Sequence, residues 1–305
     1  MNKFAFLFPG QGSQSVGMMA GFDGHKIIRD TFQEASNILG VDLWQLVTEP
    51  NEFLNQTTNT QPIMLTAGVA TWRAWAATNH AQPTVMAGHS LGEYTALVAA
   101  EALSFADALP LVRYRAEVMQ GAVAESVGAM AAILGLDDAV VLAVCAEAAQ
   151  GEVLEAVNLN SPGQVVIAGH KSAVERGMAL AKEKGAKRAL ALPVSVPSHC
   201  ALMKPAADKL REYLTAVNIN TPKVPVLHNA DVIAYTEAAQ IKDALVRQLY
   251  SPVRWVETIQ AIAALGVTNT AECGPGKVLA GLTKRIVSEL PCVALVNNEA
   301  LITAL

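Results

Sequence analysis

The sequence of 305 residues is poor in charge: 16% of its residues are Asp, Glu, Lys or Arg, while 52% are hydrophobic. Such an apolar composition argues against disorder, because disordered chains bury too little apolar surface to offset their conformational entropy. The charges sum to −5 and no basic run occurs, which argues against binding to nucleic acid. We therefore expect a compact globular protein with a substantial core.

Long apolar runs and metal-binding motifs are also missing. No stretch approaches the roughly 18–20 apolar residues of a membrane-spanning helix, and the run Phe4–Phe8 is too short for a secretory signal. The four cysteines are far apart and the six histidines form no metal motif, so neither a disulfide framework nor a bound metal is expected. These absences predict a cytoplasmic protein without a membrane partner, with a monomer as the default state.

Short apolar runs of strand length alternate with longer amphipathic stretches, a pattern typical of a parallel α/β fold. The predicted strands are Lys3–Phe8, Thr84–Gly88, Val224–His228, Thr268–Cys273 and Cys292–Val296. The predicted helices are Leu91–Ala100, Phe105–Ala122, Ala206–Val217, Ala239–Tyr250, Val256–Leu265 and Val278–Leu290.

A central segment has a different order of elements, β-α-β-β-α-β. Its predicted strands are Ala129–Leu136, Val153–Asn160, Gln164–Ala168 and Arg188–Leu192, and its helices are Asp138–Ala149 and Ser172–Lys184. The turn Ser161-Pro162-Gly163 makes the middle two strands a hairpin, and the order is the ferredoxin-like one. We therefore predict a small ferredoxin-like subdomain at 124–196, inserted between residues 1–123 and 197–305 of a larger α/β subdomain, with a ligand site in the crevice between them.

The segment Gly88-His89-Ser90-Leu91-Gly92 fits the pattern G-x-S-x-G between a predicted strand and a predicted helix. Its glycines allow a sharp turn that presents the serine hydroxyl at the carboxyl edge of the sheet, facing the positive end of the helix. The alternative is a chance match, since the pattern is short. By itself the motif indicates only a serine acyl enzyme.

A serine nucleophile needs a base, and the candidate is His199, in the loop that follows the predicted insert. An exposed loop histidine is the alternative, and His170 and His228 at predicted strand ends stay open as well. No carboxylate presents itself as a third triad member, so a backbone carbonyl is another way to orient the imidazole. Cys200 is predicted to be a buried thiol.

The segment Phe8–Gln14 follows the first predicted strand and contains two glycines, which let the backbone approach a ligand. A dinucleotide loop, G-x-G-x-x-G, would need glycine where Ser15 stands, so that reading is rejected. The remaining prediction is an oxyanion hole formed by the backbone amide of Gln11 and that of Leu91.

Arg115 lies on the apolar stripe of a predicted helix, in line with Ala108, Val112 and Met119. An arginine in such a stripe is either buried with a partner or faces a cavity. Its permanently charged guanidinium suits the binding of a carboxylate through two parallel hydrogen bonds, whereas a structural ion pair is an equal alternative. Arg113 falls on another face and is predicted to be solvated.

Taken together, these motifs resemble those of the malonyl-CoA:acyl carrier protein transacylases of bacterial type II fatty acid synthesis, which are related to the acyltransferase domains of polyketide synthases. The resemblance covers residues 3 to about 290. The matching segments are Phe8–Gln14 (FPGQGSQ), Gly88–Tyr94 (GHSLGEY), Ser161–His170 (SPGQVVIAGH), Val194–Met203 (VSVPSHCALM), Gln248–Pro252 (QLYSP) and Gly274–Leu279 (GPGKVL).

The resemblance implies an α/β-hydrolase-like subdomain with a ferredoxin-like insert and an active site between them. It implies that Ser90 is the nucleophile and His199 the base, and that no cofactor is bound. It further implies roles for the malonyl-binding Arg115, the oxyanion-hole amides of Gln11 and Leu91, the main-chain carbonyl of Gln248 that orients the histidine, and a pocket-lining Asn160.

The expected reaction is a ping-pong transfer of malonyl from malonyl-CoA to the phosphopantetheine thiol of acyl carrier protein, through a Ser90 ester, for fatty acid synthesis. The alternatives are a dedicated extender-unit acyltransferase of a polyketide pathway, a serine esterase or thioesterase, and an inactive module that binds carrier protein. An acidic carrier protein would need a local basic patch on this acidic chain. The candidate patches are Lys182, Lys184, Lys187 and Arg188, or Lys277, Lys284 and Arg285.

Overall fold

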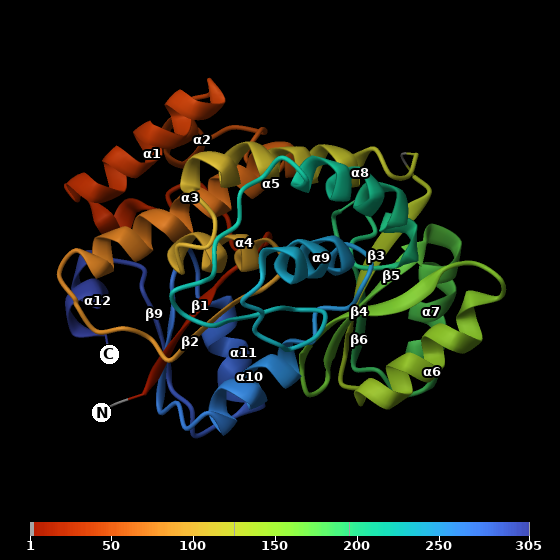
Figure 1. Cartoon of the computed structure of the whole chain (residues 1–305). Coiled ribbons are helices and arrows are strands. Elements are labelled where there is room, and N and C mark those ends of the chain that lie inside the picture. Colours follow the sequence, from red (N-terminus) through yellow and green to blue (C-terminus); the bar gives the residue numbers. More distant parts are fainter. Residues whose placement is uncertain (1–2, 125, 195, 305) are drawn as a thin grey trace.

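A computed structural model describes residues 3–124, 126–194 and 196–304. Ser195 of the predicted motif Val194–Met203, and residue 125 near the start of the predicted insert, lie outside the described residues. The chain forms two separate sheets, one parallel and one antiparallel, each with its own helices (Figure 1). The mixed α/β class expected from the sequence is therefore confirmed.

The first sheet has five strands in the order β7-β2-β1-β8-β9, and every neighbouring pair is parallel. The strands are β1 (Phe4–Phe8), β2 (Val85–Gly88), β7 (Val226–Leu227), β8 (Asn269–Glu272) and β9 (Cys292–Ala294). Each predicted strand of the large part is present, although β7 is limited to two residues. Because all five run the same way, their carboxyl ends share one edge.

Alternation along β1 explains why helices cover both faces of this sheet. Phe4, Phe6 and Phe8 point into the core beneath α1 (Lys26–Leu39), α3 (Thr57–Ala76), α4 (Leu91–Ala99) and α5 (Phe105–Gln120). Ala5 and Leu7 point to the opposite face, beneath α10 (Trp255–Ala264) and α11 (Val278–Ile286). The result is a three-layer sandwich in which β1 is buried throughout.

The second sheet is antiparallel and has the order β4-β5-β3-β6. Its chain order is β3 (Gly128–Leu134), α6 (Asp138–Ala149), β4 (Leu154–Ser161), β5 (Gln164–His170), α7 (Lys171–Glu183) and β6 (Arg188–Ala191). This is the predicted ferredoxin-like arrangement, with its own core between the sheet and the two helices. Figure 1 shows it on one side of the molecule, away from both chain ends.

The chain enters and leaves the insert at neighbouring points, since a side chain at Gly128 would lie 2.5 Å from Cδ of Pro197. The insert is also tied to the large part by backbone hydrogen bonds. Val253 donates to the carbonyl of Val157 on β4 at 2.8 Å and accepts from the N–H of Leu159 at 3.0 Å. These contacts support the boundaries 124–196, which stay a prediction.

Several helices extend the predicted set. The helices α8 (Lys204–Leu214) and α9 (Ala238–Gln248) match predictions, and α11 ends at Ile286, four residues before its predicted end. Helices α1 and α3, the short helices α2 (Leu43–Thr48) and α12 (Asn298–Thr303), and the 3₁₀ turns Ala20–Phe22 and Ala201–Met203 were not predicted. None of the described helices is long and apolar enough to cross a membrane.

Candidate active site

The predicted catalytic groups gather at the carboxyl edge of the parallel sheet. Gln11 follows β1, Ser90 follows β2 and Asn229 follows β7, all on neighbouring strands. His199 comes from the loop after the insert, and Arg115 from α5. Loops at this edge of a parallel sheet are where α/β proteins place their ligands.

Ser90 occupies a strained turn between β2 and α4. Its φ of 52° and ψ of −109° are unusual for a residue with a side chain, and α4 begins at the next residue. The turn is so tight that a side chain at Gly88 would lie 1.9 Å from the carbonyl carbon of Gly92. This geometry is that of the nucleophile elbow, which requires glycine at both flanking positions.

His199 is placed to act as a base toward Ser90. Its Nε2 lies 2.8 Å from Ser90 Oγ, and its Nδ1 lies 2.8 Å from the backbone carbonyl oxygen of Gln248. Because a carbonyl can only accept, Nδ1 carries the proton and Nε2 is left to accept the serine proton. The contact with the Gln248 carbonyl that the resemblance implies is therefore present, and its role in orienting a base stays a prediction.

Burial favours the neutral form of this histidine. His199 is 3% exposed, and its pKa is lowered from 6.5 to about 3, mainly by desolvation and in part by the nearby charge of Arg115. The hydrogen bond to the Gln248 carbonyl opposes these effects. At neutral pH the imidazole is therefore unprotonated, the form that a general base needs.

Arg115 is 1% exposed and points its guanidinium at the nucleophile. It donates to the carboxamide oxygens of Gln61 at 2.7 Å and Gln248 at 2.9 Å, and to Ser90 Oγ at 3.2 Å. Burial lowers its pKa, although a guanidinium keeps its proton. Among the described residues no carboxylate forms an ion pair with it, so the structural ion pair considered above is not what holds it.

The remaining predicted site residues are Gln11, Leu91 and Asn160. The loop of Gln11 contacts the elbow, since a side chain at Gly10 would lie 3.7 Å from the Leu91 amide nitrogen. Within the described part of the chain the backbone amides of Gln11 and Leu91 donate to no protein acceptor, as an oxyanion hole requires. Asn160 is 8% exposed and bonds to His89 Nε2 through Oδ1 at 2.8 Å. It does not line the cavity, whereas Asn158 does.

A cavity of about 800 Å³ opens over these residues, between the two sheets. The large part contributes Ser90, His199 and Arg115 to its floor. The insert contributes a wall made of Met130, Asn158, Leu192, Pro193 and Val194. Neutral amide side chains also line the cavity, among them Gln11, Gln14, Asn55 and Gln56. The site can therefore hold an elongated acyl donor with a carboxylate at its inner end.

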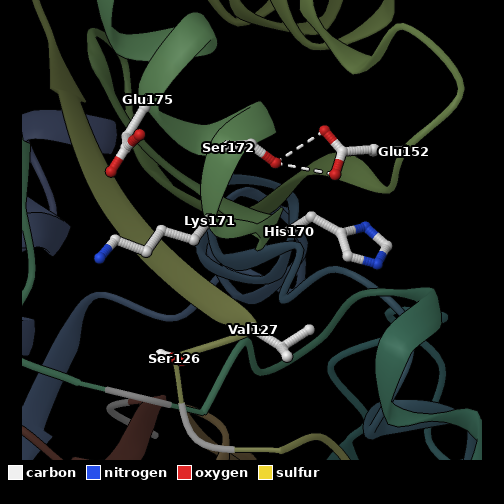
Figure 2. A pocket seen from close by; sticks show the side chains of 7 residues that line it. All are labelled: Ser126, Val127, Glu152, His170, Lys171, Ser172 and Glu175. Atoms are coloured by element: carbon white, nitrogen blue, oxygen red, sulfur yellow. Dashed lines mark hydrogen bonds between the residues drawn. The ribbon is translucent and has the colours of Figure 1, made fainter.

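A second, more open hollow of about 460 Å³ lies on the insert, where β5 meets α7 (Figure 2). In Figure 2 the Ser172 hydroxyl points at the Glu152 carboxylate, to which it donates at 2.7 and 2.8 Å. Arg176 also donates to Glu152, and the His170 Nδ1 accepts from the Val153 amide. These groups fasten a turn to the start of α7. His170, which the sequence left open as a base, lines this hollow and not the cavity that contains Ser90.

Three residues of the site, Gln61, Glu93 and Asn229, are not among those predicted from the sequence. Gln61 comes from α3, an unpredicted helix. Glu93, 0% exposed, accepts from Gln248 Nε2 at 2.9 Å and from the Asn229 amide at 2.8 Å. Glu93 lies inside the motif GHSLGEY, and Asn229 directly follows a predicted strand. Their positions in the sequence are therefore the only signal that could have identified them as site residues.

Among the residues that the structure describes, no group of His, Cys, Asp and Glu could hold a metal ion.

The sequence profile described as acyl transferase domain matches residues 5–301. This chain belongs to the acyl transferase family. The match reaches past residue 290, where the motif resemblance ended.

Curated and solved relatives of this acyl transferase span its whole length. The malonyl CoA-acyl carrier protein transacylase of Salmonella typhimurium is 58% identical, over 100% of this chain and 99% of its own. The crystal structure of an acyl-carrier-protein S-malonyltransferase from Burkholderia pseudomallei is 59% identical, with a TM-score of 0.97 and 98% of each chain covered. A malonyl-transacylase solved in complex with a type II polyketide synthase acyl carrier protein is 53% identical, with a TM-score of 0.98 over 100% and 99% of the chains.

Proposed function

We propose that this acyl transferase moves a malonyl group from malonyl-CoA to the phosphopantetheine thiol of acyl carrier protein. The observation that carries the proposal is the buried guanidinium of Arg115, which lies 3.2 Å from Ser90 Oγ and, among the described residues, donates its hydrogen bonds to uncharged groups. A cation in that position suits an acyl group that ends in a carboxylate. The names of the full-length relatives agree with this substrate.

In the first half-reaction His199 Nε2 takes the Ser90 proton as Oγ attacks the thioester carbonyl. The backbone amides of Gln11 and Leu91 stabilise the oxyanion, and the tetrahedral intermediate collapses to a malonyl ester of Ser90. The coenzyme A thiolate leaves with the proton that His199 accepted. Arg115 meanwhile binds the malonyl carboxylate and keeps the acyl group oriented.

In the second half-reaction the phosphopantetheine thiol of the carrier protein enters the same cavity. His199 takes the thiol proton, the sulfur attacks the ester carbonyl, and the same amides stabilise the second oxyanion. Collapse forms the malonyl thioester, and Ser90 recovers its proton from His199. The two half-reactions use one set of groups because both thiols end in the same pantetheine arm.

A serine hydrolase would share Ser90, His199 and the amides, so the acyl selectivity and the fate of the ester distinguish the two. A hydrolase has no need for a buried guanidinium beside the nucleophile. The insert residues Met130, Leu192 and Val194 line the cavity that would hold the ester, and we expect this wall to restrict access of water to it. Both features favour transfer to a thiol.

We further propose that the malonyl carrier protein feeds fatty acid synthesis, and that the chain works as a cytoplasmic monomer without a bound cofactor. A polyketide pathway is the second candidate, because the solved relative in complex with a type II polyketide synthase carrier protein is 53% identical over the whole chain. Activity with carrier proteins of both kinds, measured side by side, separates the two candidates.

Intact-protein mass spectrometry tests the proposal. The chain and its Ser90→Ala variant are incubated separately with malonyl-CoA and with acetyl-CoA. We expect a malonyl adduct on the unmodified chain, little acetyl adduct, and neither on the variant. Release of free malonate without a lasting adduct would indicate a hydrolase. The absence of both adduct and release would indicate an inactive binding module.

A further inference from the structure

Asn229 holds the nucleophile turn by its backbone. Its side chain is almost completely buried at the end of β7, beside β2 in the sheet. The carboxamide Oδ1 accepts the Ser90 N–H at 2.7 Å, and Nδ2 donates to the Gly88 carbonyl at 2.7 Å. One side chain therefore joins the peptide groups on both sides of His89, where β2 turns into α4.

These two hydrogen bonds pair backbone groups that the turn removes from the regular strand and helix hydrogen bonding. With φ at 52° and ψ at −109°, Ser90 leaves the strand ladder before the helix ladder has started. Its N–H has no helical acceptor, and a buried N–H without a hydrogen-bond partner destabilises the folded state. Asn229 supplies an acceptor there and a donor for the Gly88 carbonyl, so the carboxamide orientation is fixed by both partners.

Asn229 is itself held in place by a buried carboxylate. Its N–H donates to Glu93 Oε2 at 2.8 Å, and the same oxygen accepts from Gln248 Nε2 at 2.9 Å. The other carboxylate oxygen lies 2.7 Å from His228 Nδ1. Glu93 lies in the first turn of α4, so the elbow, Asn229 and the residue that orients the catalytic histidine share one anchor.

We propose that Asn229 is a positioning residue for acyl transfer: its carboxamide holds Ser90 in the strained conformation that brings Oγ to His199 and into the cavity. The role concerns the reactivity of the serine and not the recognition of malonyl. It rests on the proposed function only in that Ser90 is taken as the nucleophile.

The test compares two acyl donors on the native chain and on Asn229→Ala. One donor is malonyl-CoA, and the other is p-nitrophenyl acetate, a neutral ester whose attack by Ser90 releases p-nitrophenolate and makes no use of Arg115. We expect Asn229→Ala to slow acylation about 10- to 100-fold with both donors, with KM for malonyl-CoA within about threefold of the native value. Slowing with malonyl-CoA alone, or wild-type rates with both, would overturn the proposal.

Asn51 offers a matched control for general loss of stability. Its carboxamide also fastens a loop, with donations to the carbonyls of Leu46 and Glu49 and acceptance from the amides of Phe53 and Leu54, and it does not line the cavity. Asn51→Ala should lower the melting temperature and leave both acylation rates unchanged. Equal slowing in Asn51→Ala and Asn229→Ala would mean that Asn229 acts only through stability, against the proposal.

If Asn229→Ala does not fold, Asn229→Asp carries the test. It keeps an acceptor for the Ser90 N–H but places a second oxygen against the Gly88 carbonyl. Slower reaction with p-nitrophenyl acetate is expected, and a native rate would contradict the proposal. Should the native chain react with p-nitrophenyl acetate but not with malonyl-CoA, the proposed function fails while the role of Asn229 is still tested.

Discussion

The parallel-sheet part and the antiparallel insert contribute unlike groups to the same cavity. The large part supplies every charged or nucleophilic group, on segments tied together by hydrogen bonds of 2.7–3.2 Å around Ser90, His199 and Arg115. The insert supplies Met130, Leu192 and Val194, and the amide of Asn158. The proposed chemical groups thus all belong to the large part, whereas the insert lines the space above them.

This division leads to an ordered set of expectations. Substitutions in the large part should change the chemical step or the acyl selectivity by orders of magnitude. Substitutions on the insert should change mainly how the long thiol substrates approach, with smaller effects. A large decrease in the rate of the chemical step after substitution of an insert residue would contradict this division.

The largest effect is expected for the base. His199→Ala should slow malonylation of Ser90 by ~10³–10⁴-fold, because proton transfer to the imidazole is lost while the oxyanion hole stays intact. His89→Gln is the matched variant, since His89 also lines the cavity and bonds to Asn160. We expect less than a tenfold change there in rapid-quench measurements. Equal losses in both variants would contradict the assignment of the base.

Arg115 should set the preference for malonyl. Arg115→Ala should reduce the ratio of malonyl to acetyl transfer by ~10²-fold, the value of a charge-assisted hydrogen-bonded pair. Arg113→Ala is its control on the same helix, because Arg113 is half-exposed and pairs with Glu117 at 3.5 Å. Competition assays with the two donors measure the ratio. A preserved malonyl preference in Arg115→Ala would contradict the role given to its guanidinium.

The low pKa of His199 predicts an unusual pH dependence. A histidine with the ordinary pKa of 6.5 would lose half its base form at that pH, whereas burial lowers the pKa to about 3. Acylation should therefore stay nearly constant from pH 7.5 to 5 and fall only as the pH approaches the lowered value. Single-turnover rates across this range test it, and a midpoint near pH 6.5 would contradict it.

The same shift has a consequence for stability. Burial lowers the pKa of both His199 and His89, so below pH 6.5 these two histidines take up protons more readily in the unfolded chain than in the folded chain. The unfolded state then binds more protons, so the free energy of unfolding should decrease as the pH falls from 6.5. Urea unfolding at several pH values measures this decrease.

The smallest effect is expected at the insert. Lys187 and Arg188 are exposed at the start of β6, and the other end of this strand leads into the cavity-lining Leu192, Pro193 and Val194. We expect these two charges to attract an acidic carrier protein. Reversing both charges should lower kcat/KM for the carrier protein by ~3- to 10-fold at low salt, and less at high salt, with the malonyl-CoA step unchanged. Reversal of Lys284 and Arg285 on α11 is the comparison. A loss only in that second variant would transfer the docking role to α11.

Local patterns explain which parts of the fold were predictable. The insert was predicted in full because each element has its own apolar pattern and its hairpin has a Pro-Gly turn. Helix α3 was not predicted, because fourteen of its twenty residues are buried and no polar face marks it. Helix α1 is also outside the predicted set, although Ile28, Phe32 and Ala35 form a stripe typical of an amphipathic helix.

The site follows the same rule. Ser90 and His199 lie in short motifs, and Arg115 is conspicuous as a charge in an apolar stripe. Asn229 has no such mark, because its role depends on a contact with Ser90 across 139 residues of sequence. Gln61 and Glu93 act through contacts of the same kind. A residue whose role depends on a tertiary contact cannot be identified from a single sequence.

The most direct test of the whole account follows the fate of the malonyl ester. The malonylated chain, freed of coenzyme A, is mixed either with carrier protein bearing phosphopantetheine or with buffer alone, and the ester is followed by intact mass. We predict rapid transfer to the carrier thiol and an ester that persists in buffer at least ~100-fold longer. Loss of the ester at the same rate in both mixtures would mean hydrolysis and would contradict the account.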